Sequence, residues 1–216
     1  MLMACPRSLR QRRASGGQGH GFTLVEMMVA IAIIAVLLAL AAPSMREMIE
    51  MRRLRAINAQ LVTDLQYVRS EAIARRAYGR IEFNVDPTLP LTCYTIYTAI
   101  DSLKGCDCNL GAGKACKDNP GAVEIRTVQV PKSTATVIGI PGVRGVRESL
   151  MWTVGFEAAM GSLVGLLVDT NPQPLAGYAI DTRIDAARSM RIMLSQSGRP
   201  TVCAPAGSRV ELPPCP

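Results

Sequence analysis

Residues 21–43 read GFTLVEMMVAIAIIAVLLALAAP, a run of apolar side chains that contains a single acid, Glu26. The stretch from Phe22 to Ala42 has 21 residues, and as a helix it spans about 31 Å, the thickness of the hydrocarbon core of a bilayer. An ionised carboxylate in such a helix costs about 3 kcal/mol on insertion scales, so it persists only where a partner compensates for it. We therefore interpret Glu26 as a functional group that requires a counter-charge.

The segment before the apolar run is basic. It contains no acidic residue and four arginines, Arg7, Arg10, Arg12 and Arg13. The positive-inside bias predicts that this side stays in the cytoplasm and that the chain after Ala42 lies on the other side of the membrane. The rival interpretation is an ordinary signal peptide, because Ala39-Leu40-Ala41 has the small-x-small form of a signal peptidase site. Cleavage there would release a soluble secreted domain.

The motif in residues 21–43 resembles the N-terminal signature of type IV prepilins and type II secretion pseudopilins. It has a Gly before an aromatic residue, a Glu fifth in the processed chain, a full apolar span and a Pro at its end. The resemblance implies that a prepilin peptidase cleaves between Gly21 and Phe22, that the new Phe22 amine is methylated, and that the helix assembles with other pilins or pseudopilins. Glu26 would then neutralise the Phe22 amine of a neighbouring subunit in a desolvated site.

After Pro43 the apolar residues recur at steps of three and four, which predicts that one helix runs from Phe22 to about Ala77 with Gly79 as its stop signal. The apolar face is formed by Leu54, Ile57, Leu61, Leu65, Val68 and Ala72. The residues expected to face away from it are Arg52, Arg53, Arg55, Asp64 and Arg69. We expect the apolar face to pack on a globular domain and the basic face to be solvated near the headgroups of inner membrane lipid.

From Arg80 onward, short runs rich in β-branched and aromatic residues alternate with turn signals and predict antiparallel strands. The runs are 81–85, 92–98, 123–130, 136–140, 150–156, 163–168 and 190–194. A long N-terminal helix, with a membrane-spanning half and an amphipathic half, packed on an antiparallel β-sheet domain is an α+β plan. The resemblance implies the same arrangement, the type IV pilin fold, in a single-pass inner membrane protein. The expected parts are a leader at 1–21, a transmembrane and assembly helix at 22–42, its amphipathic continuation at 43–78, and a periplasmic β-rich domain at 79–216.

Six cysteines follow the leader: Cys93, Cys106, Cys108, Cys116, Cys203 and Cys215. An even number in an exported domain favours disulfides. Cys106 and Cys108 are too close in sequence to bridge each other, so two pairings stay open, 93–106 with 108–116 or 93–108 with 106–116. Cys203 would then pair with Cys215. Zinc is the weaker alternative, because the sole histidine is His20 in the leader and the spacing is CxC, so we expect no metal and no cofactor.

The composition after the leader argues against an enzyme. A chain without histidine after His20 cannot form a Ser-His-Asp or Cys-His arrangement. The run Gly111-Ala112-Gly113-Lys114 fails as a phosphate loop, because Cys108 and Ala115 stand where such a loop needs Gly and Ser or Thr. Removal of the four leader arginines leaves 20 basic against 17 acidic residues, a net charge of about +3, which weakens a general polyanion-binding role. We interpret the protein as non-enzymatic.

Residues 190–203 resemble the last strand pair of FimT/GspH-type minor pilins and pseudopilins, in which a strand ends in a Ser-x-x-Gly-Arg turn before a final strand. Some members of that group bind DNA through a Gly-Arg-x-Arg motif here, and Gly198-Arg199-Pro200-Thr201 keeps only the first arginine. Each phosphate contact adds about 0.9 to the salt slope on duplex DNA, so one arginine is not enough. Arg191 and Arg209 are the further DNA-binding candidates, Arg209 on the expectation that a Cys203–Cys215 bridge holds it near Arg199.

The resemblances together predict a minor pilin that contributes to pilus biogenesis, with DNA uptake as a hypothesis. The first alternative is a GspH-type minor pseudopilin of a type II secretion system, and the second is the secreted soluble domain.

Overall fold

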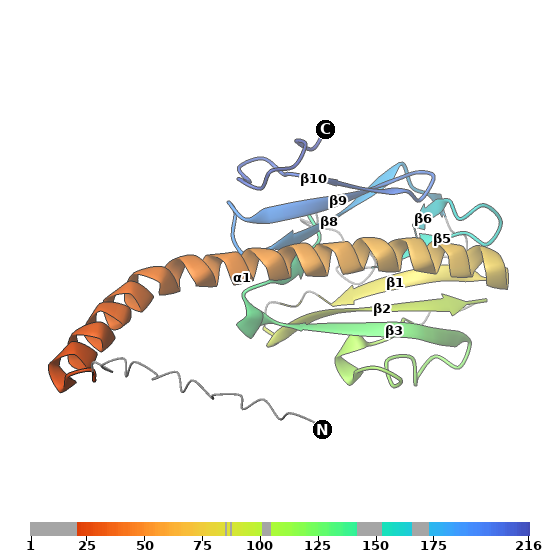
Figure 1. Ribbon diagram of the computed structural model, residues 1–216. Helices are drawn as coiled ribbons and strands as arrows, with labels where there is room; N and C mark the ends of the chain where they lie inside the picture. Colours follow the sequence, from red (N-terminus) through yellow and green to blue (C-terminus); the bar gives the residue numbers. More distant parts are fainter. Residues whose placement is uncertain (1–20, 85, 87, 101–104, 142–152, 166–172) are drawn as a thin grey trace, which may run out of the picture. The chain divides into compact units, whose positions relative to one another are not determined.

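The computed structural model describes residues 21–84, 86, 88–100, 105–141, 153–165 and 173–216. The chain divides into two compact units, Met1–Ser44 and Met45–Pro216, called unit 1 and unit 2 below. Helix α1, Leu24–Arg75, contributes to both (Figure 1). The described part of unit 1 therefore consists of the start of α1 and the three residues before it.

The end of α1 is a Schellman motif. The backbone N–H of Ala77 donates to the carbonyl of Ala72 at 3.1 Å, and the N–H of Arg76 donates to that of Ile73 at 3.3 Å. Arg76 takes the left-handed conformation, with φ 52°, that glycine more often supplies. The prediction that Gly79 stops the helix is therefore wrong, because Arg76 supplies the reversal three residues earlier. The helix is two residues shorter at each end than the expected span.

The larger sheet of unit 2 is antiparallel, in the order β3-β2-β1-β5-β6-β7. Its strands are β1 (Tyr78–Asn84), β2 (Leu91–Ala99), β3 (Ala122–Pro131), β5 (Thr153–Phe156), β6 (Leu163–Gly165) and β7 (Gln173–Pro174). In the register Ile81 lies opposite Ile96 on one side and Val154 on the other. All three are buried, so the register aligns apolar side chains across neighbouring strands.

The smaller sheet is also antiparallel, in the order β10-β9-β8-β4. Its strands are β4 (Val137–Gly139), β8 (Gly177–Arg183), β9 (Ser189–Ser195) and β10 (Pro200–Cys203). Strands β9 and β10 form the hairpin expected for residues 190–203, and its turn is closed by a bond from Gly198 N–H to the Ser195 carbonyl at 2.8 Å. Two short 3-10 helices, η1 (Cys108–Leu110) and η2 (Lys132–Thr134), complete the described elements.

The core of unit 2 is shared by both sheets and one face of α1 (Figure 1). Its helical side chains are those of the predicted apolar face, among them Leu61, Leu65, Val68 and Ala72, each with no exposed surface. Full burial of one Leu or Ile side chain contributes about 1.5–3 kcal/mol. The predicted α+β plan, a long helix packed on antiparallel strands, is confirmed.

Asp64 differs from its sequence-based expectation. Helical periodicity placed it on the polar face, but its side chain is 1% exposed. Its two oxygens accept from the Arg126 guanidinium and the Tyr94 hydroxyl, each at 2.7 Å. Charge-assisted bonds of this kind are about twice as strong as neutral ones. Asp64 is therefore a polar connection between α1 and strands β2 and β3.

Three disulfides connect the cysteines that follow the leader. They are Cys93–Cys108, Cys106–Cys116 and Cys203–Cys215. Of the two pairings that the sequence left open in the first group, the structure has the second. The first bridge joins η1 to β2, the second closes the segment from Cys106 to Cys116, and the third closes the segment that follows β10.

Candidate processing and assembly site

The predicted cleavage position lies just before α1. Residues 21–23 are non-helical, and the helix begins at Leu24. An added Cβ at Gly21 would meet no atom within 4 Å, and Phe22 is 76% exposed. The Gly21–Phe22 bond is therefore in open, non-helical backbone, where a peptidase can bind it without unwinding a helix.

Thr23 caps the helix. Its hydroxyl accepts from the backbone N–H of Glu26 at 3.2 Å, and its carbonyl accepts from the N–H of Met27 at 3.2 Å. Thr23 and Glu26 thus have the Ser/Thr-x-x-Glu spacing of a capping box, which fixes the position where a helix begins. Our reading of the sequence missed this role of Thr23, although its spacing three residues before Glu26 carries the signal.

Glu26 lies in the first turn of α1. The positive end of the helix dipole favours a carboxylate at this position. The described residues supply no ion pair to it, and the side chains around it in sequence are apolar and exposed, such as Val25 and Met28. A cation from outside the chain can therefore reach it.

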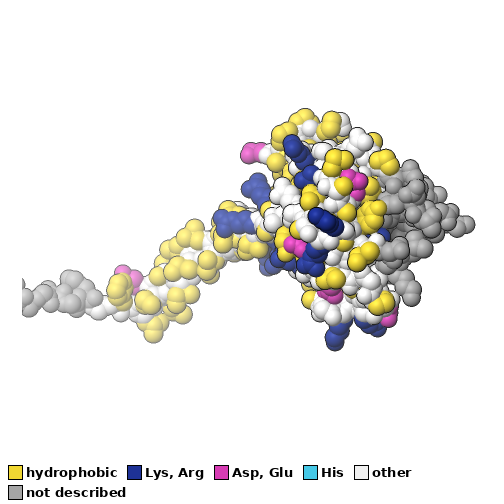
Figure 2. All heavy atoms as spheres, turned by 90° about the vertical axis from the view of Figure 1, so that its right-hand side faces the viewer, with side chains coloured by type: hydrophobic (Ala, Val, Ile, Leu, Met, Phe, Trp, Pro, Cys, Tyr) yellow, Lys and Arg dark blue, Asp and Glu magenta, His cyan; other side chains and the backbone are white. Residues whose placement is uncertain are grey.

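The rest of the described part of unit 1 is an apolar helical surface. Its side chains from Leu24 to Ala42 are exposed, and Figure 2 shows hydrophobic side chains covering this part of the helix on the side in view. An 18-residue window of α1 reaches a mean hydropathy of 2.8, which is long and apolar enough to cross a membrane. A signal sequence also meets that criterion, so hydropathy alone does not distinguish a membrane anchor from a signal sequence.

Residues 19–42 match the protein family described as the prokaryotic N-terminal methylation motif. The N-terminal segment of the chain therefore carries this methylation motif. The chain is also similar to solved structures of the type IV minor pilin FimU of Pseudomonas aeruginosa PAO1 in two crystal forms. One aligns over 72% of this chain and 91% of FimU at 17% identity with a TM-score of 0.44, and the other over 71% and 89% at 16% identity with a TM-score of 0.37. No curated protein matches the sequence.

The three candidate DNA-binding arginines do not form one patch. Arg191 makes a bidentate ion pair with Asp181, its cross-strand neighbour, at 2.7 and 2.9 Å. Arg199 hydrogen-bonds through its backbone to Ser195 at one end of β9, and Arg209 to Ala187 near the other end. The seven residues of β9 between them span about 23 Å. The expectation that the Cys203–Cys215 bridge brings Arg209 to Arg199 is wrong, because the bridged segment folds back to the opposite end of β9.

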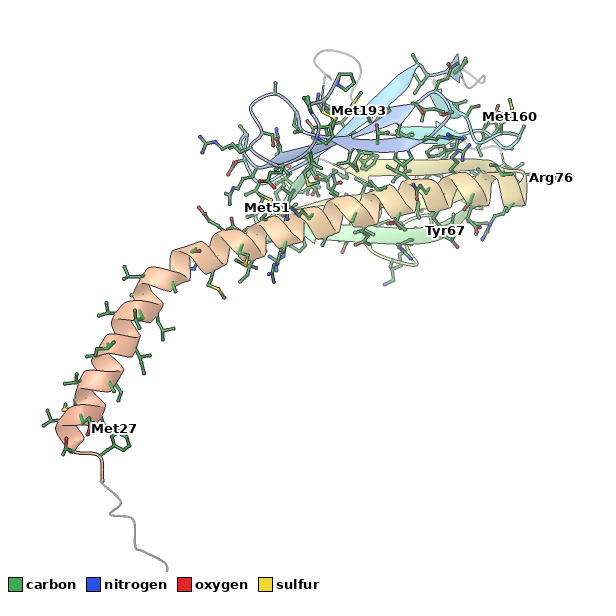
Figure 3. The ribbon with its side chains drawn as sticks, turned by 45° about the horizontal axis from the view of Figure 1, so that its top comes forward. Met27, Met51, Tyr67, Arg76, Met160 and Met193 are labelled. Carbon is green, nitrogen blue, oxygen red and sulfur yellow. A yellow bond between two sulfur atoms is a disulfide. The ribbon has the colours of Figure 1, made fainter. Side chains whose placement is uncertain are left out.

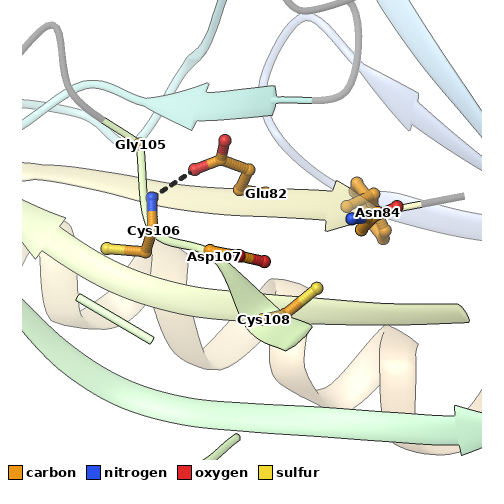
Figure 4. Close-up of a pocket in the computed structure, with 7 residues that line it drawn as sticks. Glu82, Asn84, Gly105, Cys106, Asp107 and Cys108 are labelled. Carbon is orange, nitrogen blue, oxygen red and sulfur yellow. Dashed lines mark hydrogen bonds between the residues drawn. The ribbon is translucent and has the colours of Figure 1, made fainter. Parts of the chain in front are cut away.

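A second acid, Glu82, lines a pocket beside the disulfide-bonded segment (Figure 4). Its carboxylate accepts from the Cys106 N–H at 2.6 Å and from the Tyr97 hydroxyl at 3.2 Å. Burial raises the pKa of Glu82, and the two hydrogen bonds and the charge of Arg80 oppose that rise. Over the described residues, no group of three or more His, Cys, Asp or Glu side chains could hold a metal ion. Glu82 therefore holds the 105–108 segment to β1.

Proposed function

We propose that the chain is a FimT/GspH-type minor pilin that is incorporated into a type IV pilus and contributes to its biogenesis. A prepilin peptidase cleaves it between Gly21 and Phe22, and the Phe22 amine is methylated. Before assembly it is a single-pass inner membrane protein with its disulfide-bonded domain in the periplasm. Its role is assembly rather than catalysis.

The observation that carries this proposal is the position of Glu26. It is an acid in the first turn of an exposed apolar helix and forms no ion pair with the residues that the structure describes. In lipid such a carboxylate costs about 3 kcal/mol. The Phe22 amine of a neighbouring subunit compensates for that cost when the apolar helices pack together, so the pair favours the filament over the free subunit.

The location of the two possible cleavage sites supports processing at Gly21. The Gly21–Phe22 bond precedes the helix, whereas Ala39-Leu40-Ala41 lies inside α1. Cleavage at the latter would divide a continuous helix and release a soluble domain, which is the secreted alternative.

A GspH-type pseudopilin of a type II secretion system would use the same N-terminal anchor. The β9–β10 hairpin, with its Gly198-Arg199 turn, and the terminal Cys203–Cys215 bridge resemble FimT more than GspH, so we favour the pilus. We do not extend the proposal to DNA uptake, because Arg191 is neutralised by Asp181 and Arg209 lies at the far end of β9.

The test compares Glu26→Ala with Glu47→Ala in a host that assembles pili. Glu47 is an exposed acid of the same helix that follows the apolar segment. Cleavage should continue in both variants, because the Gly21–Phe22 bond is unchanged. Recovery of Glu26→Ala in sheared filaments should fall at least about tenfold, because a buried charge without its partner costs about 3–5 kcal/mol. Normal incorporation of Glu26→Ala would count against the charge-pairing account.

A further inference from the structure

Arg199 lies beside a second arginine that the sequence did not connect with it. Gln66, Arg69, Gly198, Arg199 and Pro200 line one pocket of unit 2, between α1 and the β9–β10 turn. The lining contains two guanidinium groups and one amide and no carboxylate. The pocket therefore has the charge of an anion site.

Arg69 is held in place by the turn that follows β5. Its Nε donates to the Gly161 carbonyl at 2.9 Å, and its Nη2 donates to the Met160 carbonyl at 3.1 Å. These bonds fix the plane of the guanidinium, and the described residues accept no hydrogen bond from its third nitrogen, Nη1. A planar group fixed in this way is preorganised for a carboxylate or phosphate oxygen.

Two glycine turns pack tightly behind this arginine. Gly161 and Gly198 have φ values of 65° and 73°, and an added Cβ at Gly198 would lie 2.5 Å from the Gly161 carbonyl oxygen. An added Cβ at Gly161 would lie 2.8 Å from the Arg69 side chain. Only glycine permits this approach, so the backbone around the pocket is closely packed.

Two exposed apolar residues lie close to Arg69 without lining the pocket. Met160, 72% exposed, belongs to the same turn that holds Arg69, and Ile73, 40% exposed, lies one helical turn beyond Arg69. In Figure 3 Met160 lies at the end of unit 2 where α1 ends and Arg76 follows it. Arg69 follows Met45 by 24 residues (69 − 45), so it is about 36 Å along the helix from the start of unit 2. This exceeds the Debye length of about 8 Å several times, which argues against a lipid headgroup at the Met45 end as the anion.

We propose that this pocket binds an acidic side chain of an adjacent pilin subunit, with Met160 and Ile73 contacting apolar side chains around it. The inference rests on the proposed function, since it requires the chain to enter a filament. A protein carboxylate fits better than a nucleic-acid backbone, because the pocket offers two cations with exposed apolar residues nearby rather than a row of cations.

The experiment replaces the full chain in a pilus-assembling host by Arg199→Glu or by the matched control Arg209→Glu. Both arginines are exposed, and they lie near opposite ends of β9. We expect Arg199→Glu to lower recovery in sheared filaments at least about fivefold, because juxtaposed like charges cost several kcal/mol, and Arg209→Glu to change it less than about twofold. A photo-crosslinking amino acid in place of Met160 should link, within filaments, to a pilin peptide that contains Asp or Glu, and Arg199→Glu should abolish that link.

Equal recovery of Arg199→Glu and wild type would overturn this inference and leave the proposed function intact. Absence of the wild-type chain from filaments would instead contradict the proposed function itself. In a third arm, the detergent-solubilised chain is titrated with a labelled DNA duplex at several salt concentrations. Salt-sensitive binding that Arg199→Glu removes, combined with unchanged filament recovery, would assign the pocket to phosphate and overturn the carboxylate proposal.

Discussion

At the scale of single residues, three acids of this chain differ in the partners that their carboxylates have. Asp64 is buried with Arg126 and Tyr94 as fixed partners, whereas Glu82 is partly buried and accepts from a backbone N–H and a hydroxyl. Glu26 has no ion-pair partner among the described residues. A carboxylate that is satisfied within its own chain stabilises the fold, and one that is not requires another molecule. This difference separates the structural acids from the one that we assign to assembly.

The first prediction concerns the pH dependence of stability. Burial raises the pKa of Glu82 above its ordinary value of 4.5, so the folded protein holds this proton more tightly than the unfolded chain does. Its contribution to the free energy of unfolding is full below pH 4.5 and is lost as the pH rises through the raised value. Glu82→Gln keeps an oxygen acceptor for the Cys106 N–H but cannot ionise.

We therefore expect the free energy of unfolding to decline less with rising pH in Glu82→Gln than in wild type, from about pH 4.5 to pH 7. Guanidinium denaturation of the detergent-solubilised chain, followed by circular dichroism, measures this. Glu211→Gln, at an exposed acid, is the control and should keep the wild-type profile. Identical profiles for Glu82→Gln and wild type would show that this proton does not contribute.

At the scale of elements, the contact between α1 and β1 depends on Gly79. A Cβ at this position would lie 2.6 Å from the Val68 carbonyl oxygen and 2.9 Å from the Ala72 Cβ. Both are atoms of a packed helix that cannot rotate away, so β1 approaches α1 closely only because Gly79 has no side chain.

Gly79→Ala should lower the free energy of unfolding by about 1–3 kcal/mol, the usual cost of overpacking a core. Gly139→Ala is the matched control, because Gly139 is also in a strand and an added Cβ there meets nothing within 4 Å. The control should change stability by less than about 0.5 kcal/mol. Chemical denaturation measures the free energy of unfolding of both variants, and equal values would refute the close-packing account.

The sequence predicted these elements to different degrees, for physical reasons. Helical periodicity located the buried face of α1, because apolar residues recur at the helical repeat. It could not predict that Asp64 is buried, because the partners Tyr94 and Arg126 come from distant strands. It missed β8, whose inward Ile180 and Thr182 alternate with Ala179 and Asp181, so its pattern is only weakly apolar. It also missed β7, because a two-residue strand is too short to show a pattern. Residues 85, 150–152 and 166–168, which were predicted to belong to strands, lie outside the described ranges.

Separation in sequence also decided which parts of the candidate sites could be predicted. Gly21, Phe22 and Glu26 lie close together in the sequence, so their motif could be read directly. The pocket formed by Arg69 and Arg199 could not, because the two arginines are 130 residues apart (199 − 69) and meet only through the fold. The same fold separates Arg199 from Arg209, which are ten residues apart in sequence (209 − 199).

At the scale of the whole molecule, the two units have different chemistry. Unit 1 exposes apolar side chains along its helix, whereas unit 2 buries a core shared by two sheets and closes its segments with three disulfides. A chain with both properties suits lipid at one end and an oxidising aqueous compartment at the other. In the function that we propose, cleavage at Gly21 joins these roles, because it would create the Phe22 amine that pairs with a neighbouring Glu26.

Intact-mass spectrometry of the chain recovered from sheared filaments tests this claim most directly. We predict a species that begins at an N-methylated Phe22 and carries three disulfides. An uncut precursor, or a product that begins after Ala41, would contradict it.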